Sequence, residues 1–143
     1  MGQFEGVVDT NLGLLPTLEI LVRETAARGR ISIETHLEEA AMSPTVELTA
    51  YRFVQEALTN IMKHSAAKHV LVTLHAYPHH VELCVSDDGV GFATEKVKVF
   101  SYGLSGMRQR VIASGGKLVI NSEAGTGTRI TVTLPRTANI TTT

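Results

Sequence analysis

The chain has 143 residues, which allows one domain of ordinary size and leaves no room for two. Apolar residues make up 43% and charged residues 19% of the chain, a composition typical of a globular protein rather than a disordered one. The 13 basic and 14 acidic residues give a net charge of −1, so a concentrated basic surface for nucleic acid is not expected.

The first predicted element is a helix over Asn11–Arg28, in which Asn11 can cap the start and Gly29 stands at the stop. Its apolar residues at helical spacing are Leu14, Leu15, Leu18, Leu21 and Val22. Apolar residues then alternate with polar ones over Ile31–Leu37, which predicts a strand.

A second helix is predicted from Pro44 to about Lys63, because Ser43 followed by proline is a helix-start signal. Its apolar stripe consists of Leu48, Tyr51, Val54, Leu58 and Ile61. On the opposite side, at about 100° per residue, a narrow arc holds Arg52, Glu56, Asn60 and Lys63. The oxygens of this arc suit Mg²⁺ and the lysine suits phosphate, while a plain solvated helix face is the alternative interpretation.

The rest of the chain reads as short strands and one helix. Two alternating runs, Val70–Leu74 and Val81–Val85, predict an antiparallel hairpin. The pattern then predicts a glycine-rich loop over 87–91, an irregular segment over 93–102, a helix over Gly103–Ser114, and strands over Leu118–Asn121 and Thr128–Leu134. Helices that interrupt hairpins of strands indicate an α+β fold with a mixed sheet and the helices on one face.

Two glycine-containing segments carry residues suited to a nucleotide. Asp87 ends a strand, and its carboxylate can accept a hydrogen bond from an exocyclic amine such as that of adenine. The glycines that follow, Gly89 and Gly91, let the backbone approach a ligand. Gly103 and Gly106 stand at a predicted helix start, where free N–H groups and the helix dipole favour phosphate. Each segment taken alone is also explained by an ordinary turn or hinge.

The order of the segments is more specific than any one of them. The chain carries, in order, Glu56-x-x-x-Asn60-x-x-Lys63-His64, Asp87-x-Gly89-x-Gly91, Gly103-x-x-Gly106 and Gly125-x-Gly127-Thr128. It has neither a P-loop nor a dinucleotide-binding G-x-G-x-x-G motif after a strand. Over residues 12–136 this order resembles the ATP-binding catalytic domain of sensor histidine kinases, within the GHKL or Bergerat-fold ATPases. The resemblance implies a two-layer α/β sandwich with a mixed, mostly antiparallel sheet and about three helices on one face.

The resemblance also implies roles for individual residues. Asn60 would coordinate Mg²⁺, Asp87 would accept a hydrogen bond from the adenine amino group, and Thr128 would support the same water network. The other residues implied in ATP binding are Lys63, His64, Gly89, Gly91, Gly103, Leu104, Gly106 and Met107. Glu56 stands where water-activating members of the superfamily have a general base, and its role here stays open. Asp88 replaces a frequent asparagine without affecting a named contact.

The implied cofactors are ATP and Mg²⁺, and the implied reaction is transfer of the γ-phosphoryl group to a histidine nitrogen by positioning and charge neutralisation. The accepting histidine would lie on a separate dimerisation domain, because none of the six histidines here precedes an acidic residue. The glycine string from Gly103 to Arg110 is most similar to the subfamily partnered with NarL-type response regulators.

These implications give expectations for the whole chain. Residues 1–10 are expected to be a tail or linker end, residues 11–136 the catalytic domain, and residues 137–143 a disordered tail. We expect a monomeric fragment that cannot phosphorylate itself, and whose partners are ATP, the phosphoacceptor domain and, indirectly, a NarL-type response regulator. The apolar runs are too short for a membrane span and the N-terminus lacks a secretory signal, so a cytoplasmic location is expected.

Three other functions fit parts of the sequence. An anti-sigma-factor-type serine kinase has the same fold and about this length, but the glycine string and the short segment before Gly103 argue against it. A clamp ATPase such as a chaperone or topoisomerase needs a second domain, for which the chain is too short. A metal module could use His75, His79, His80 and Cys84, but alternation along a hairpin directs neighbouring side chains to opposite faces. The lone cysteine excludes an internal disulfide.

Overall fold

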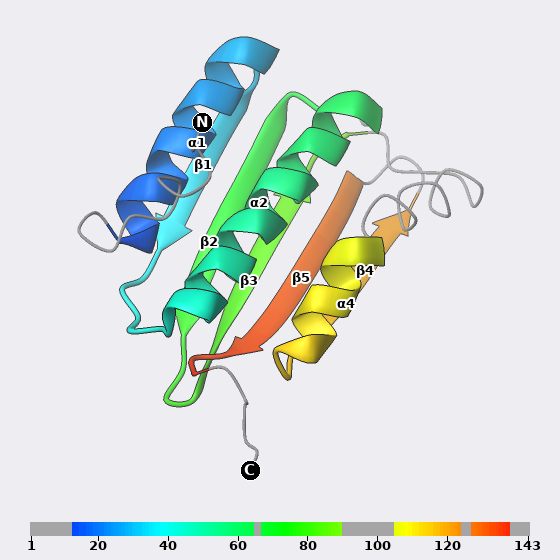
Figure 1. Ribbon diagram of the computed structural model, residues 1–143. Helices are drawn as coiled ribbons and strands as arrows, with labels where there is room; N and C mark the ends of the chain where they lie inside the picture. The colour runs from blue at the N-terminus through cyan, green and yellow to red at the C-terminus, as the bar shows by residue number, and fades with distance from the viewer. Residues whose placement is uncertain (1–12, 65–66, 90–104, 124–126, 138–143) are drawn as a thin grey trace.

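The computed structural model describes residues 13–64, 67–89, 105–123 and 127–137, and these form three helices and five strands (Figure 1). In chain order the elements are α1 (Leu14–Gly29), β1 (Ser32–Leu37), α2 (Pro44–His64), β2 (His69–Ala76), β3 (His80–Asp87), α4 (Ser105–Ala113), β4 (Lys117–Glu123) and β5 (Gly127–Pro135). None of the helices in these ranges is long and apolar enough to cross a membrane.

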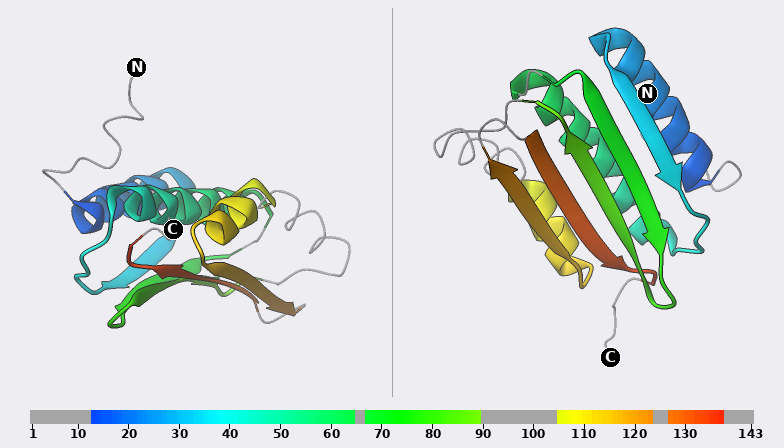
Figure 2. Two further views of the ribbon diagram at one scale, coloured as in Figure 1. Left: turned by 60° about the horizontal axis from the view of Figure 1, so that its bottom comes forward. Right: turned by 180° about the vertical axis from the view of Figure 1, so that it is seen from behind.

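The five strands form one mixed sheet in the order β1-β2-β3-β5-β4. β1 runs parallel to β2, and all other neighbouring strands are antiparallel. Figure 2 shows α1, α2 and α4 lying over one face of this sheet, while the opposite face carries no helix of the described chain. The predicted two-layer α+β arrangement, with a mostly antiparallel sheet, is therefore confirmed.

Every second side chain along the central strands is directed toward the helices and fills the space between the two layers. In β2, β3 and β5, the residues directed toward the helices are buried and most of their neighbours are half-buried or exposed. The largest fully buried side chains are Leu18, Val46, Phe53, Val54, Leu58, Ile61, Leu74, Leu83, Ile130 and Leu134. The edge strand β1 alternates only between half-buried and exposed, so the helix layer covers it less completely.

The ends of α1 differ from the expected ones. The helix begins at Leu14 behind Gly13, whose φ is 86° and which provides no side-chain cap, while the predicted cap Asn11 lies outside the described residues. Arg30 rather than Gly29 adopts the left-handed conformation, with a φ of 55°. A Cβ at Gly29 would overlap Cε of Met62, which is the end of a flexible side chain that is 36% exposed and can turn away. α1 and α2 thus approach each other at this point, without requiring a glycine there.

α2 begins as predicted, but its buried face is wider. The hydroxyl oxygen of Ser43 accepts a hydrogen bond from the N–H of Val46 at 3.4 Å. The prediction of Leu48 as a stripe residue is wrong, because its side chain is 36% exposed. The placement of Asn60 on a side facing away from the core is also wrong, because it is 6% exposed. The reason is that α2 is the central helix and packs against α1, α4 and the sheet.

Arg136 ties together three segments at the end of the sheet where β5 finishes. Its Nε donates to the carbonyl oxygen of Ala41 and its Nη1 to that of Tyr77, each at 3.0 Å. Its own carbonyl oxygen accepts from the N–H of Ser43 at 2.9 Å. The start of α2, the β2–β3 hairpin and the end of β5 are thereby joined.

Candidate nucleotide-binding site

The end of the sheet away from Arg136 gathers the predicted site residues. There α2 and β3 end, and β5 and α4 begin (Figure 1). Asp87 is the last residue of β3, Thr128 is the second residue of β5, and Asn60 lies about one turn before the end of α2. Three segments that are far apart in the sequence are thus brought to one end of the fold.

Asp87 and Thr128 are direct neighbours across the β3–β5 ladder. Both are buried, with 8% of Asp87 and 3% of Thr128 exposed. Oδ1 of Asp87 accepts a hydrogen bond from the N–H of Gly89 at 2.7 Å, so the turn after β3 orients the carboxylate. A buried carboxylate beside a buried hydroxyl can both accept and donate hydrogen bonds, which suits the polar edge of a base.

Gly127 brings β5 against β3 at this point. Its φ is 95°, a backbone conformation that glycine adopts without strain. A Cβ here would overlap the carbonyl oxygen of Asp87 and would lie 3.1 Å from its carbonyl carbon. In the structure Gly127 therefore sets the approach of the two strands that carry Asp87 and Thr128.

Asp88 is a structural part of the site that sequence reasoning missed. Its Oδ1 accepts hydrogen bonds from the N–H groups of Lys68 at 3.0 Å and His69 at 2.9 Å. These bonds, that from His69 foremost, lower the pKa of the exposed carboxyl group. Asp88 therefore fastens the turn after Asp87 to the start of β2. The available signal was a second carboxylate directly after a strand end, a position from which it can cap backbone groups.

The side-chain amide oxygen of Asn60 is the atom predicted to bind Mg²⁺. Its Nδ2 donates to the backbone carbonyl of Glu56 at 3.0 Å, which leaves Oδ1 as the atom for a ligand. Glu56 is half-buried one turn earlier on α2. Mg²⁺ accepts oxygen ligands and is usually held by one or two protein groups together with substrate phosphates and water. The donors present are therefore compatible with Mg²⁺ bound chiefly through a nucleotide.

The structure says less about a role in ATP binding for the other predicted residues. Lys63 is exposed and, with Arg28, lines a groove of about 260 Å³ between α1 and α2. Met107 is 5% exposed and belongs to the core, so packing alone accounts for an apolar residue there. Gly106 is exposed in the first turn of α4, and His64 is the last residue of α2. The predicted residues Gly91, Gly103 and Leu104 lie outside the described part of the chain.

The alternative metal module has no counterpart in the fold. Across the described ranges, no group of three or more histidine, cysteine, aspartate or glutamate side chains could hold a metal ion. His75 lies 3.6 Å from a carboxylate oxygen of Glu38, and the ring of His80 stacks on Tyr77 with centroids 4.6 Å apart. Cys84 is half-buried on β3.

Sequence comparisons place the chain among known ATPases. The family described as histidine kinase-, DNA gyrase B-, and HSP90-like ATPase matches residues 45–138. Sensor histidine kinase LiaS of Bacillus subtilis is 39% identical over 123 residues, which are 86% of this chain and 34% of LiaS. The histidine-protein kinase/phosphatase DegS of Brevibacillus brevis is 36% identical over 129 residues, 89% of this chain and 33% of DegS. The chain thus spans about a third of the length of these curated relatives.

Solved structures share the fold. The histidine kinase domain of the blue-light activated histidine kinase EL346 from Erythrobacter litoralis superposes with a TM-score of 0.76 at 19% identity, over 91% of this chain and 64% of that one. The histidine kinase AdeS of Acinetobacter baumannii gives 0.67 at 15% identity, over 83% and 62%. The family match begins within α2 and extends past β5, and so includes Asn60, Asp87 and Thr128. The chain belongs to the histidine kinase-, DNA gyrase B- and HSP90-like ATPase family.

Proposed function

We propose that this chain binds ATP with Mg²⁺ and presents the γ-phosphate to a histidine on a separate dimerisation domain of a sensor histidine kinase. The observation that carries the proposal is the buried pair Asp87 and Thr128 at the end of the sheet. The pair stands in a member of an ATPase family, and the curated relatives LiaS and DegS are named as a sensor histidine kinase and as a signal transduction histidine-protein kinase/phosphatase.

In this proposal each part of the site has one task. Asp87 accepts a hydrogen bond from the adenine amino group, and the bond from Gly89 keeps its carboxylate in position. Thr128, beside it on β5, completes the polar surface that meets the base. Asn60 supplies an oxygen to Mg²⁺, which when bound would neutralise phosphate charge during transfer. Lys63 and the N-terminal turn of α4 would meet the phosphates.

The partners proposed follow from the same reaction. The acceptor histidine would come from another part of the kinase, and a NarL-type response regulator would receive the phosphoryl group from it. A cytoplasmic position, where ATP is available, goes with this proposal. Both relatives are named as histidine kinases, which supports this function over the serine-kinase alternative.

Calorimetric titration of this chain with ADP and with a non-hydrolysable ATP analogue, each with and without Mg²⁺, tests the proposal. Asp87→Asn keeps the shape but replaces one of the two carboxylate oxygens by an NH₂ donor. If the amide oxygen keeps the bond from Gly89, the NH₂ group meets the adenine amino group donor to donor, so binding should fall by at least about tenfold. Asp88→Asn is the matched control, because it removes the same charge next door and its amide oxygen can still accept from Lys68 and His69. Equal affinity of both nucleotides for the parent and Asp87→Asn would refute the assignment of Asp87.

A further inference from the structure

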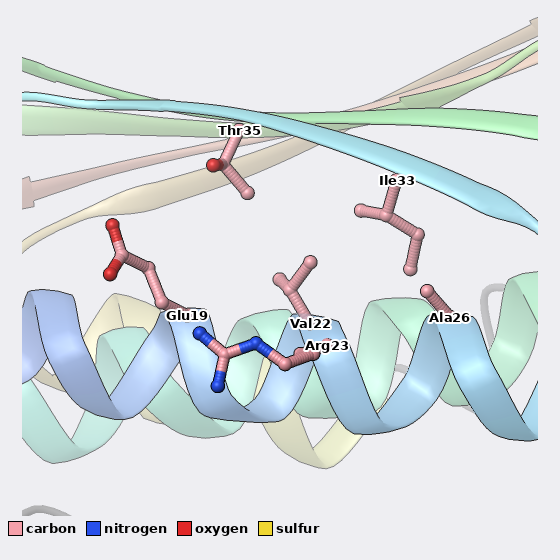
Figure 3. Close-up of a pocket in the computed structure, with 6 residues that line it drawn as sticks. All are labelled: Glu19, Val22, Arg23, Ala26, Ile33 and Thr35. Carbon is pink, nitrogen blue, oxygen red and sulfur yellow. The ribbon is translucent and has the colours of Figure 1, made fainter.

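The face of the sheet opposite the helices, called the open face below, is uncovered in the described chain (Figure 2). Figure 3 shows Ile33 and Thr35 of β1 directed toward α1. Because side chains alternate along a strand, Glu34 and His36 are directed to the open face. The register of the ladders continues the row of Glu34 across this face through Leu71, Ser86 and Arg129.

The centre of the open face is uncharged and consists mostly of short side chains. The next row crosses β2, β3 and β5 through Thr73, Cys84 and Thr131. These three residues are half-buried, as are Leu71 and Ser86 beside them. A shallow hollow of about 280 Å³ lies over this group. Packed sheets lie about 10 Å apart, so short side chains at the centre let a second sheet approach to this distance.

Charged side chains surround this centre. Glu34 and His36 lie on the β1 side, and Arg129 lies on the β5 side. His75 and Glu82 are direct neighbours on β2 and β3, one row beyond the centre. Among the described residues, neither Glu82 nor Arg129 has an ion-pair partner. A surface complementary to the open face therefore brings an anion to Arg129 and a cation to Glu82.

A second copy of the open face provides both charges in one orientation. A two-fold axis along the strands, between β2 and β3, places β1 of each copy over β5 of the other and β2 over β3. Glu34 of each copy then lies opposite Arg129 of the other. His75 of each copy likewise lies opposite Glu82 of the other. Each of these contacts occurs twice, and the uncharged centres meet at the axis.

The other two-fold arrangements of the same face oppose like charges. An axis over β3 places Glu82 opposite its own equivalent, and an axis over β2 does the same for His75. An axis between β3 and β5 places His75 opposite Lys117 and leaves β1 uncovered. An axis across the strands brings Glu34 over Glu38. Like charges placed opposite each other disfavour an interface, so the axis between β2 and β3 is selected.

The helices do not obstruct this arrangement. α1, α2 and α4 all lie on the other face of the sheet (Figure 2), so both helix layers would be on the outside of the dimer. The two sheets would form its inner layers, with their strands about 30° apart. The long side chains of Glu34 and Arg129 can span the small offset that this angle produces.

We propose that two copies of this chain associate face to face through the open face, with Glu34 of each copy paired to Arg129 of the other. Coverage of β1, β2, β3 and β5 in both copies corresponds to roughly 1,000 Å² in total, at the lower limit of specific interfaces, so the expected dissociation constant is about 0.1 mM. The sequence-based expectation of a monomer rested on the missing dimerisation helices, whereas the open face provides a different basis for association. This inference does not depend on nucleotide binding.

A charge exchange between two exposed positions tests the orientation. Sedimentation equilibrium of the parent chain, from about 10 µM to 1 mM, should show reversible dimers. Arg129→Glu opposes two glutamates at two places and should weaken association by about tenfold, and Glu34→Arg should do the same by opposing two arginines. The double variant restores opposite charges and should recover the association of the parent. Arg23→Glu, the same charge change on the exposed side of α1, is the control and should leave association unchanged.

Alkylation of Cys84 by N-ethylmaleimide locates the contact. Cys84 is the only cysteine of the chain and lies half-buried at the centre of the open face. With a dissociation constant of about 0.1 mM, most of the parent is dimeric at 1 mM, so its alkylation rate constant should be about fivefold lower there than at 10 µM. Arg129→Glu, which is mostly monomeric at both concentrations, should show a much smaller difference.

Four results would overturn the proposal. The first is the absence of dimers up to about 1 mM. The second is an effect of Arg129→Glu and Glu34→Arg no larger than that of Arg23→Glu. The third is a double variant that associates as weakly as the single ones, and the fourth is a parent in which Cys84 reacts equally fast at both concentrations.

Discussion

Gly127→Ala should disturb the fold and the candidate site together. The glycine has a φ of 95°, and a Cβ at this position would overlap the carbonyl oxygen of Asp87. The obstacle is backbone rather than the end of a flexible side chain, so a change of rotamer cannot relieve it. β3 and β5 must separate at the position where Asp87 and Thr128 stand side by side.

The loss of folding free energy expected for Gly127→Ala has two parts. A left-handed backbone conformation costs an alanine about 1–2 kcal/mol. Moving a packed ladder by about 1 Å to admit a methyl group costs about 1–3 kcal/mol more, by analogy with overpacked cores. A total of about 2–5 kcal/mol should lower the unfolding midpoint by roughly 5–15 °C in a chain of this size. Nucleotide affinity should also fall in the fraction that stays folded, because the paired side chains are displaced.

Substitutions at two further glycines distinguish a loss of stability from a displacement of the site residues. Gly116 lies toward the far end of the sheet from Asp87, and a Cβ there would overlap the carbonyl oxygen of Thr133 without a left-handed φ. Gly116→Ala should therefore destabilise the chain but leave the affinity of the folded fraction unchanged. Within the described ranges, a Cβ at Gly106 would meet no atom within 4 Å beyond its own helix backbone and chain neighbours, so Gly106→Ala should leave stability unchanged or raise it by up to about 1 kcal/mol.

Thermal unfolding followed by circular dichroism, together with nucleotide titration at about 10 °C, distinguishes the three variants. Unfolding of Gly127→Ala within about 2 °C of the parent would show that the strain and the overlap are absent. An equal loss of nucleotide affinity in Gly116→Ala and Gly127→Ala would contradict a specific effect on the site. In that case the loss would reflect general destabilisation rather than displacement of the Asp87 and Thr128 pair.

Three other substitutions test separate features. Asn60→Ala should weaken the Mg²⁺-dependent part of nucleotide binding by at least about tenfold in calorimetry. Thr59→Ala, which removes a similar side-chain bond to a helix carbonyl one residue away, should not. Asp88 has a lowered pKa, so its charged form should stabilise the fold above pH of about 4, and this contribution should disappear as the pH falls through the pKa of the folded state. Urea unfolding should therefore show the stability difference between the parent and Asp88→Asn shrinking from pH 7 to pH 2. Arg136→Ala should lower the free energy of unfolding by about 1 kcal/mol in the same assay, because two exposed bonds to backbone carbonyls are lost, and an unchanged value would argue that they contribute nothing.

The elements of the fold were predictable because their signals are local. Alternation marked β2 and β3, and Ser43 followed by proline marked the start of α2, as the bond from Val46 shows. The end of α1 was less predictable, because the local pattern offers Gly29 as the stop, whereas the left-handed conformation falls one residue later at Arg30. A glycine is the residue expected at such a position, so a propensity rule places the end of the helix one residue too early.

The types of residue in the candidate site were predictable from the sequence. The burial and the backbone contacts that hold these residues in place were not. Asp87 was recognisable as a carboxylate at the end of a strand, and the structure places it beside Thr128. The burial of Asn60 was not predicted, since helical periodicity considers one buried face and α2 is covered on several sides. Asp88 and Gly127 act through the backbone of other strands, and such contacts depend on sheet pairing that a linear pattern does not specify.

The register of the β3–β5 ladder links the core to the site. Val85 pairs with Ile130, both fully buried, and the next pair on the same side is Asp87 with Thr128. Because side chains alternate along a strand, a slip of one residue would move Val85 and Ile130 out of the core and would turn Asp87 toward the open face of the sheet. The hydrophobic gain that opposes such a slip therefore also fixes the direction of the Asp87 carboxylate. This accounts for how an exposed end of the sheet holds a buried, oriented acid: its position is set by the apolar pair two residues away and by the close approach that Gly127 permits.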